Sequence, residues 1–344
     1  MKKQSNAYWI KRAEDNVKDY HADVDKTMKA LNNSFNSSTN KLNDQIKKIY
    51  TVFKLGSGLT DTEVRELLNT KISTKEMNTL KKQIVSVTDM DLKKYLTARY
   101  NSNAYKARIT RLEAIKRQIY IETKQLYPIV LKQSNKLYTN LIYKSYYQNI
   151  FDIQKGLGIG FDFANIPVDR VNYILNHKWS DKHYSKRLWG NTDNLAEQIQ
   201  ETVLEGIMSG ISIERLAKNL SDRMQVGKFA TERLLRTETT YMVNMAELES
   251  YKECNIDRYK FLATLDRRTT KICQEHDGKI YEVGKGVSGE NLPPLHPFCR
   301  STTTAYFDYL NYSNLQRRAR DEFGNPILVS QDMNYESWKL KYTV

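Results

Sequence analysis

The chain has 344 residues, which is enough for two or three domains with real apolar cores, and its 14 glycines and 6 prolines are few enough to allow long helices. Lys and Arg number 54 against 40 Asp and Glu, so the formal charge is +14 and a polyanion such as nucleic acid is a natural partner. Three cysteines exclude a disulfide framework and indicate a reducing compartment. The N-terminus lacks an apolar signal segment, and no stretch approaches the roughly 18 apolar residues of a membrane span. We therefore expect a protein that is made and kept in a cytoplasm, or packaged into a particle assembled there.

The first fifty residues predict an amphipathic helix. Apolar residues from Tyr8 to Leu31 recur every three or four positions, and the pattern resumes through Ile46 and Tyr50. The polar run from Asn32 to Asn40 predicts a break between the two parts, and the glycine turn at residues 56–58 predicts the end of the helix.

Capping patterns predict three short helices after this turn. In each, a hydroxyl residue precedes an acid by three positions, so the hydroxyl can accept the third amide while the acid reaches back to the cap amide. The three pairs are Thr60 and Glu63, Ser73 and Glu76, and Thr88 and Asp91.

Residues 101–150 form a basic, tyrosine-rich, helix-prone tract that Pro128 interrupts. It carries nine Lys or Arg against two acids, which is half of the excess charge of the chain. One interpretation is a DNA-binding face, with cationic groups for phosphates and tyrosines for stacking. The alternative is an exposed basic helix whose tyrosines belong to the core. The candidate DNA-binding residues are Lys106, Arg108, Arg111, Lys116, Arg117, Lys124, Lys132 and Lys136.

Further helices are predicted up to about Lys252. A flexible linker at Gly156–Gly160 marks a domain boundary, and two tryptophans, Trp179 and Trp189, should anchor a loop on the domain that follows. A helix should open at Thr192 and stop at Gly210; Ser212 should cap a second helix, and a long third helix should run from Gly227 to about Lys252.

Alternating residues predict strands at 259–265, 279–283 and 301–306, and the polar, basic tail after Tyr306 reads as irregular. The fold class expected is α+β and predominantly α-helical, with long N-terminal helices and a small C-terminal antiparallel-sheet module. The expected segments are a basic helical region at 1–155, a helical middle region at 156–252, the α+β module at 253–306 and the tail at 307–344.

Two cysteine–histidine pairs within the sheet module predict a zinc site. Cys273 and His276 are separated by two residues, as are His296 and Cys299, and two such knuckles can direct four donors at one tetrahedral Zn²⁺. A closed site of this kind would be structural. The residues equally fit small buried cysteines and histidines that hydrogen-bond to carbonyls or to Asp277.

A salt bridge between loops is the second expectation for this stretch. The Asp266 carboxylate can pair bidentately with the guanidinium of Arg268 or Arg300. Using His276, Asp277 and His296 as a hydrolytic site is the alternative, but a metal with four protein donors has no open position for a substrate.

The same stretch resembles the minor head proteins, or head morphogenesis proteins, of tailed phages that are similar to the F protein of phage Mu. The resemblance covers residues 179–304 most strongly and the chain before them loosely. It rests on the following structural-motif residues together with Cys273 and Cys299: Arg236, Glu238, Asp266, Arg268, Thr269, Asp277, Gly278, Pro294, His296 and Arg300.

The resemblance implies a virion protein located inside the capsid near the portal and assembled in the cytoplasm of a bacterial host. Its implied partners are the portal protein, viral double-stranded DNA that it binds or escorts during assembly and ejection, and a scaffold or major capsid protein. Many members carry two more cysteines, at the positions of Thr270 and Ser301, so a metal site that depends on those cysteines is absent here.

Two other functions stay open. One is a metal-dependent nuclease that uses Cys273, His276, His296 and Cys299, with Asp277 as base. Another is a host-side DNA-binding regulator that uses the helical hairpin at 195–223. Glu247 and Glu249 also match the E-x-E pattern of ADP-ribosyltransferases, but no matching arginine and Ser-Thr-Ser strands lie nearby, so the pattern does not predict that activity.

Overall fold

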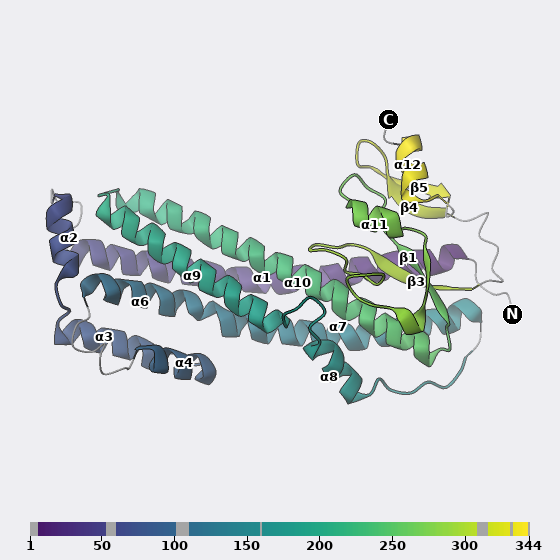
Figure 1. Cartoon of the computed structure of the whole chain (residues 1–344), viewed down its shortest axis with the longest axis horizontal. Coiled ribbons are helices and arrows are strands. Elements are labelled where there is room, and N and C mark those ends of the chain that lie inside the picture. Colours follow the sequence, from purple (N-terminus) through teal and green to yellow (C-terminus); the bar gives the residue numbers. More distant parts are fainter. Residues whose placement is uncertain are drawn as a thin grey trace. The chain divides into compact units, whose positions relative to one another are not determined.

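The computed structural model describes residues 6–52, 60–100, 110–158, 160–307, 316–330 and 333–342 (Figure 1). Its helices are α1 (Asn6–Val52), α2 (Asp61–Asn69), α3 (Thr74–Val85), α4 (Met90–Tyr100), α6 (Arg111–Lys124), α7 (Leu126–Leu157), α8 (Val168–Asn176), α9 (Tyr184–Met208), α10 (Ile213–Glu253), α11 (Lys271–His276) and α12 (Tyr335–Tyr342). Its strands are β1 (Arg258–Leu262), β2 (Ile280–Glu282), β3 (Thr302–Tyr306), β4 (Gln316–Arg320) and β5 (Pro326–Ser330). The expected α+β, mainly helical class with a small C-terminal antiparallel sheet is confirmed.

The chain forms two compact units, each built from separate stretches of sequence. Unit 1 contains Met1–Thr27, Ser134–Tyr184 and Arg233–Val344, and unit 2 contains Met28–Gln133 and Ser185–Glu232. Helices α1, α7 and α10 each contribute residues to both units. The division of the sequence into four consecutive segments stays a prediction.

Helix α1 runs through the polar stretch where a break was predicted, so that prediction is wrong. The buried positions continue in three- and four-residue steps, from Leu31 to Phe35, Ser38 and Leu42, while the polar residues between them are exposed or half-buried. Phe35 therefore continues the apolar face of α1 between Leu31 and Leu42, although the surrounding sequence is rich in asparagine and serine.

Unit 2 contains the three short helices that the capping patterns predict. Thr60 and Ser73 each form a complete capping box with Glu63 and Glu76. At α4 the predicted cap is displaced by one residue, because the carboxylate of Asp89 accepts the Leu92 amide at 2.8 Å. Helices α3 and α4 share a core with α6 and α9. Its buried residues are Leu80, Ile84, Val87, Leu92, Leu96, Tyr120, Ile121 and Ala196.

Two predicted helix boundaries in the middle of the chain are wrong. Helix α9 begins at Tyr184, eight residues before Thr192, whose hydroxyl lies inside the helix and donates to the Leu188 carbonyl at 3.1 Å. The two helices predicted after Ser212 are one helix, α10, which continues through Gly227. Gly227 is tolerated there because the missing side chain admits Leu195: an added Cβ would lie 2.4 Å from the Leu195 Cδ2 atom.

Unit 1 holds the three-stranded antiparallel sheet, in the order β2-β1-β3. In its register Tyr259 lies opposite Tyr281 of β2 and Ala305 of β3. On the helical side, Ile10 and Ala13 of α1 pack against Leu262 of β1. The sheet is therefore covered by residues from the other end of the sequence.

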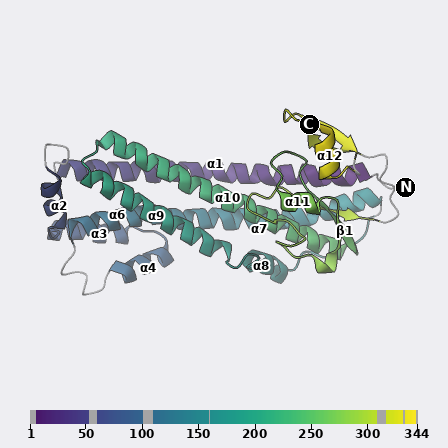
Figure 2. The same ribbon diagram turned by 45° about the horizontal axis from the view of Figure 1, so that its top comes forward.

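The tail is ordered where the structure describes it, which corrects the expectation of an irregular segment. Strands β4 and β5 form an antiparallel hairpin, and Trp338 of α12 donates from its indole nitrogen to the Arg320 carbonyl at 3.0 Å. The hairpin and α12 lie side by side in both views (Figure 1 and Figure 2). Their apolar face consists of Ala319, Val329, Tyr335 and Trp338 around Leu265, and the many charged residues of the segment conceal it in the sequence.

Candidate functional site: the loop and knuckle of the sheet module

The Asp266 carboxylate joins the two halves of the motif. Arg300 donates to it bidentately, from Nη1 to Oδ2 at 2.5 Å and from Nη2 to Oδ1 at 2.7 Å. The Arg268 guanidinium is 3.9 Å away and largely exposed, and its backbone amide donates to Asp266 Oδ1 at 3.0 Å. Burial alone raises the pKa of Asp266, but hydrogen bonds and charge from Arg300 outweigh that effect, so the pKa lies below its ordinary value. Arg300 is thus the ion-pair partner, and Arg268 shapes the loop through its backbone.

The remaining loop residues hold the backbone in place. The Thr269 hydroxyl donates to the Thr264 carbonyl, and the Tyr335 hydroxyl donates to the Asp266 carbonyl at 3.1 Å. The Asp277 carboxylate accepts the Ala263 amide at 2.9 Å, and Gly278 adopts a φ of 79°, which favours glycine. Thr269, Asp277 and Gly278 therefore fix the conformation of the loops beside the sheet. The first two do so through side-chain hydrogen bonds to the backbone, and Gly278 does so through its backbone angle.

The motif residues Arg236 and Glu238 lie on α10, and each binds a different partner. Arg236 donates to Asp25 of α1 at 2.6 Å. Glu238 is buried and accepts from the Trp179 indole nitrogen at 3.2 Å, while the Trp179 ring stacks on Tyr241 at 5.7 Å. Trp179 is therefore an anchor in unit 1, whereas Trp189 lies within α9 and packs against Tyr127 in unit 2.

Three of the four proposed metal ligands come together. Cys273 Sγ lies 3.2 Å from His296 Nε2 and 3.7 Å from Cys299 Sγ, and the three donor atoms all lie within 4.8 Å of one another. His276 is not part of this group: its Nδ1 is hydrogen-bonded to the Tyr281 hydroxyl at 2.8 Å, and its ring packs on Phe261. The predicted pairs of residues therefore yield a three-donor cluster.

Hydrogen bonding within this cluster separates the two thiols chemically. The bond from Cys273, with a further bond from His296, lowers the pKa of Cys299, while the pKa of Cys273 is raised. Hydrogen bonding to Cys299 raises the pKa of His296. Both sulfur atoms are buried, and the imidazole is half-exposed, which leaves one side of the cluster accessible.

Two threonines of α10 that the sequence did not single out position the second knuckle. The Thr237 hydroxyl accepts the Phe298 amide at 3.0 Å, and the Thr240 hydroxyl donates to the Cys299 carbonyl at 2.9 Å. Phe298 has a φ of 58°, so the backbone turns sharply between His296 and Cys299. In the sequence, Thr237 is recognisable only as a polar residue inside a predicted helix. No neighbouring residue indicates that Thr240 binds the Cys299 carbonyl.

The candidate DNA-binding residues that the structure describes divide into an exposed group and an engaged group. Lys116, Lys132 and Lys136 are exposed on α6 and α7. Arg111 is paired with Glu76, and Arg117 is buried under the Tyr100 ring. Lys106 and Arg108 lie outside the described residues.

The structure does not support the prediction that Lys124 binds a phosphate, because its side chain is buried. Its ammonium group lies 3.6 Å from the centre of the Trp189 ring and 3.0 Å from Asp193, and the side chain has no exposed surface. Burial lowers its pKa to about 8, although Asp193 partly offsets the effect. The Lys124 ammonium group therefore lies in the interior of unit 2 and is not available to bind a phosphate.

A buried carboxyl group, Glu247, lies on α10 facing the sheet. Its Oε2 atom accepts from the Thr302 hydroxyl of β3 at 3.4 Å, and only 3% of the residue is exposed. Burial raises its pKa to about 8, so the group is mainly neutral at pH 7. Sequence spacing assigned it to an E-x-E pattern and gave no sign of its burial.

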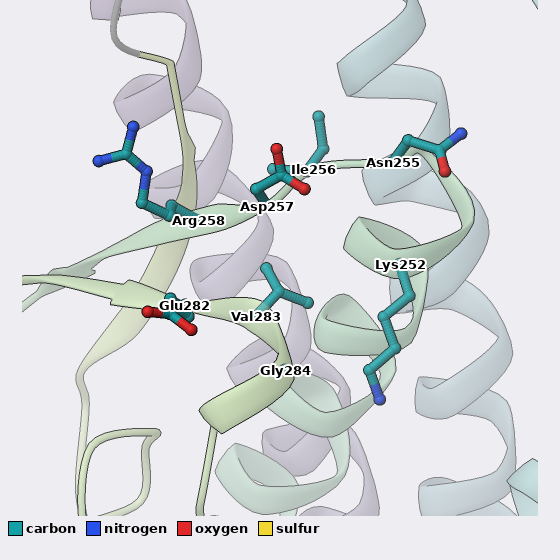
Figure 3. Close-up of a pocket in the computed structure, with 8 residues that line it drawn as sticks. All are labelled: Lys252, Asn255, Ile256, Asp257, Arg258, Glu282, Val283 and Gly284. Carbon is teal, nitrogen blue, oxygen red and sulfur yellow. The ribbon is translucent and has the colours of Figure 1, made fainter.

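A pocket of about 580 Å³ lies where α10 ends and β1 begins (Figure 3). It is lined by Lys252, Asn255, Ile256, Asp257, Arg258, Glu282, Val283 and Gly284. Lys252 is paired with Glu249 at 2.7 Å, and Glu282 with Lys285 at 2.9 Å. Two of the charged side chains that line the pocket are therefore engaged within the protein, and the lining contains none of the motif residues.

The described helices include none that is both long enough and apolar enough to cross a bilayer. A family model described as phage Mu protein F like protein matches residues 197–304. The NAD(+)–arginine ADP-ribosyltransferase EFV of Enterococcus faecalis is 25% identical over 214 residues, which are 57% of this chain and 42% of that protein. The chain thus matches less than half the length of this relative. No solved structure matches the chain. The matched segment contains Arg236, Glu238 and the whole stretch from Asp266 to Arg300, and residues 197–304 are therefore similar to the phage Mu protein F like family over the residues that carry the motif.

Proposed function

We propose that this chain is a minor head protein of a tailed bacteriophage, which acts in head morphogenesis beside the portal and is packaged in the virion. The observation that carries the proposal is the family match over residues 197–304, because it falls on the segment that contains the motif residues. In this proposal assembly takes place in the bacterial host cytoplasm, the portal is the main protein partner, and the sheet module is a folded anchor without catalytic function.

An ADP-ribosyltransferase activity is not supported by the geometry of the E-x-E pattern. Glu247 is buried against Thr302, and Glu249 is bound bidentately by Arg170, with bonds of 3.0 and 2.5 Å. Catalytic glutamates must reach a bound substrate, and neither carboxylate is free to do so. The name of the enterococcal relative therefore does not carry its activity to this chain.

A metal-dependent nuclease is also less well supported. Its proposed base, Asp277, is buried and accepts the Ala263 amide, so its carboxylate serves the loop. Its fourth metal ligand, His276, is bonded to Tyr281. A base needs hydrogen-bond access to the water that it activates.

Particle incorporation tests the head-assembly role. The chain would be produced together with the major capsid, scaffold and portal proteins of the same phage, and purified procapsids would be examined by mass spectrometry. We expect the chain in procapsids that contain the portal and its loss from particles assembled without it. Absence from both particles would refute the head role, while equal incorporation into both would refute the portal association alone.

Lys116, Lys132 and Lys136 are the residues proposed to contact viral DNA, because they remain exposed in the basic tract. Binding to duplex DNA should weaken steeply with salt, and each phosphate contact contributes about 0.9 to the slope of log K against log salt concentration. Replacing the three lysines by glutamine should reduce that slope by up to about 2.7.

A matched variant controls for net charge. Lys271, Lys279 and Lys285 are exposed in the sheet module, and their replacement by glutamine removes the same charge. We expect little change in the slope from this control variant. A flat salt response of the unmodified protein, or equal effects of the two triple variants, would refute the assignment of DNA binding to the basic tract.

A further inference from the structure

The two buried thiols lie at the separation that a shared metal ion would require. Two thiolates bonded to zinc at about 2.3 Å in tetrahedral geometry are about 3.8 Å apart, and a thiolate and an imidazole nitrogen about 3.6 Å. The observed separations are 3.7 Å between Cys273 Sγ and Cys299 Sγ, and 3.2 Å between Cys273 Sγ and His296 Nε2. A disulfide would need about 2.05 Å between the sulfur atoms, so the pair has the spacing of metal ligands.

The His296 ring is oriented as metal-binding histidines are. Its Nδ1 lies 2.8 Å from the Pro297 carbonyl oxygen. A carbonyl can only accept, so Nδ1 carries the hydrogen, and in the neutral ring Nε2 presents its lone pair to the sulfur atoms. The tautomer needed for coordination is therefore selected by the backbone.

The donors are also held in place before any ion arrives. Cys273 is carried by α11, and Cys299 by a turn that is hydrogen-bonded to Thr237 and Thr240 of α10. Fixing ligands through groups outside the coordination sphere reduces the entropy lost on binding. The half-exposed imidazole provides the route by which an ion can enter.

We propose that Cys273, His296 and Cys299 bind one Zn²⁺ ion as a three-residue site, with the fourth coordination position open to solvent and His276 excluded. Two thiolates and an imidazole are donors that zinc prefers. The ion would fasten α11 to the turn at 296–299 and so brace the motif loop. This site does not depend on the proposed head-assembly role.

Metal analysis of the purified full chain tests the site. We expect one zinc per chain after incubation with Zn²⁺ and removal of the excess, and Co²⁺ in its place should give the absorption of thiolate-bound cobalt. Cys299→Ser and His296→Ala should each lose the bound metal. His276→Ala should retain it, and so should Cys254→Ser, which removes the remaining cysteine.

A chelator provides a second measurement if the ligand variants fail to fold. Removing zinc from the unmodified protein should lower its melting temperature, and added Zn²⁺ should restore it. No bound metal after incubation, or a Cys273–Cys299 disulfide in the reduced preparation, would overturn the proposal. Loss of metal from His276→Ala while its fold persists would overturn the three-donor assignment in favour of four donors.

Discussion

Replacing Glu247 by glutamine should remove a pH-dependent loss of stability. Burial raises the pKa of this carboxyl from 4.5 to about 8 in the folded chain, whereas unfolding returns it to its ordinary value. Folding therefore takes up a proton between about pH 4.5 and pH 8. The free energy of unfolding should fall as pH rises through this window and should level off above it. Glutamine has no charge to lose, and its amide can still donate a hydrogen bond.

The size of the effect follows from the two pKa values. Each pKa unit corresponds to about 1.4 kcal/mol, so the full difference is at most ~5 kcal/mol, before the folded state relaxes around the charge. Wild type and Glu247→Gln should have similar stability near pH 4.5. Near pH 9 the variant should be more stable by several kcal/mol. Urea unfolding followed by circular dichroism at a series of pH values measures both curves.

Glu249, two residues along the same helix, is a matched control with the opposite sign. Burial raises its pKa, but hydrogen bonds from Arg170 and Lys252 outweigh burial and leave the pKa below its ordinary value. Its stabilisation is present above the ordinary glutamate pKa and is lost as pH falls through the lower, folded-state pKa. Glu249→Gln should therefore be less stable near pH 7, by about 1 kcal/mol, and should approach wild type in acid. Parallel pH curves for wild type and Glu247→Gln would show that Glu247 is charged in the fold and would refute the reasoning.

Three further predictions concern stability and are measurable by the same urea titration. Gly227→Ala should cost about 1–3 kcal/mol because its Cβ would meet Leu195, whereas Gly190→Ala, with open space around it, should add about 0.5–1 kcal/mol; equal signs would contradict the close packing. Arg300→Ala should cost about 3 kcal/mol, since Asp266 would stay buried without its main partner, and a neutral result would show that the pair adds nothing. Phe35→Ala should cost about 3–5 kcal/mol, and a cost near zero would restore the predicted break in α1.

Local rules predicted those parts of the fold that local interactions determine. The capping boxes at Thr60 and Ser73 and the stop at Gly210, whose φ is 63°, depend on a few neighbouring residues. The predicted break in α1 is wrong because the polar composition of residues 32–40 does not interrupt the apolar periodicity, which Phe35 carries from Leu31 to Leu42. The helix join at Gly227 depends on Leu195, a partner 32 positions away along the chain.

The candidate site was predictable in its residues and less so in its geometry. The spacing of Cys273 and Cys299 correctly placed two thiols together. Nothing in the sequence shows that β2 brings Tyr281 beside His276, which removes that imidazole from the cluster. Burial of Lys124 was equally inaccessible, since it depends on the packing of α9 against α6, where Trp189 and Asp193 receive the ammonium group.

Residues from both ends of the chain pack against the sheet module, so the matched segment at 197–304 should not fold well when it is produced alone. Residues 197–304 contain Leu262 and Leu265, but Leu262 packs against Ile10 and Ala13, and Leu265 packs against Trp338. A fragment cut at the limits of sequence similarity would leave these apolar side chains bare and should aggregate. A transfer of this segment into another protein would therefore have to include α1, the β4–β5 hairpin and α12.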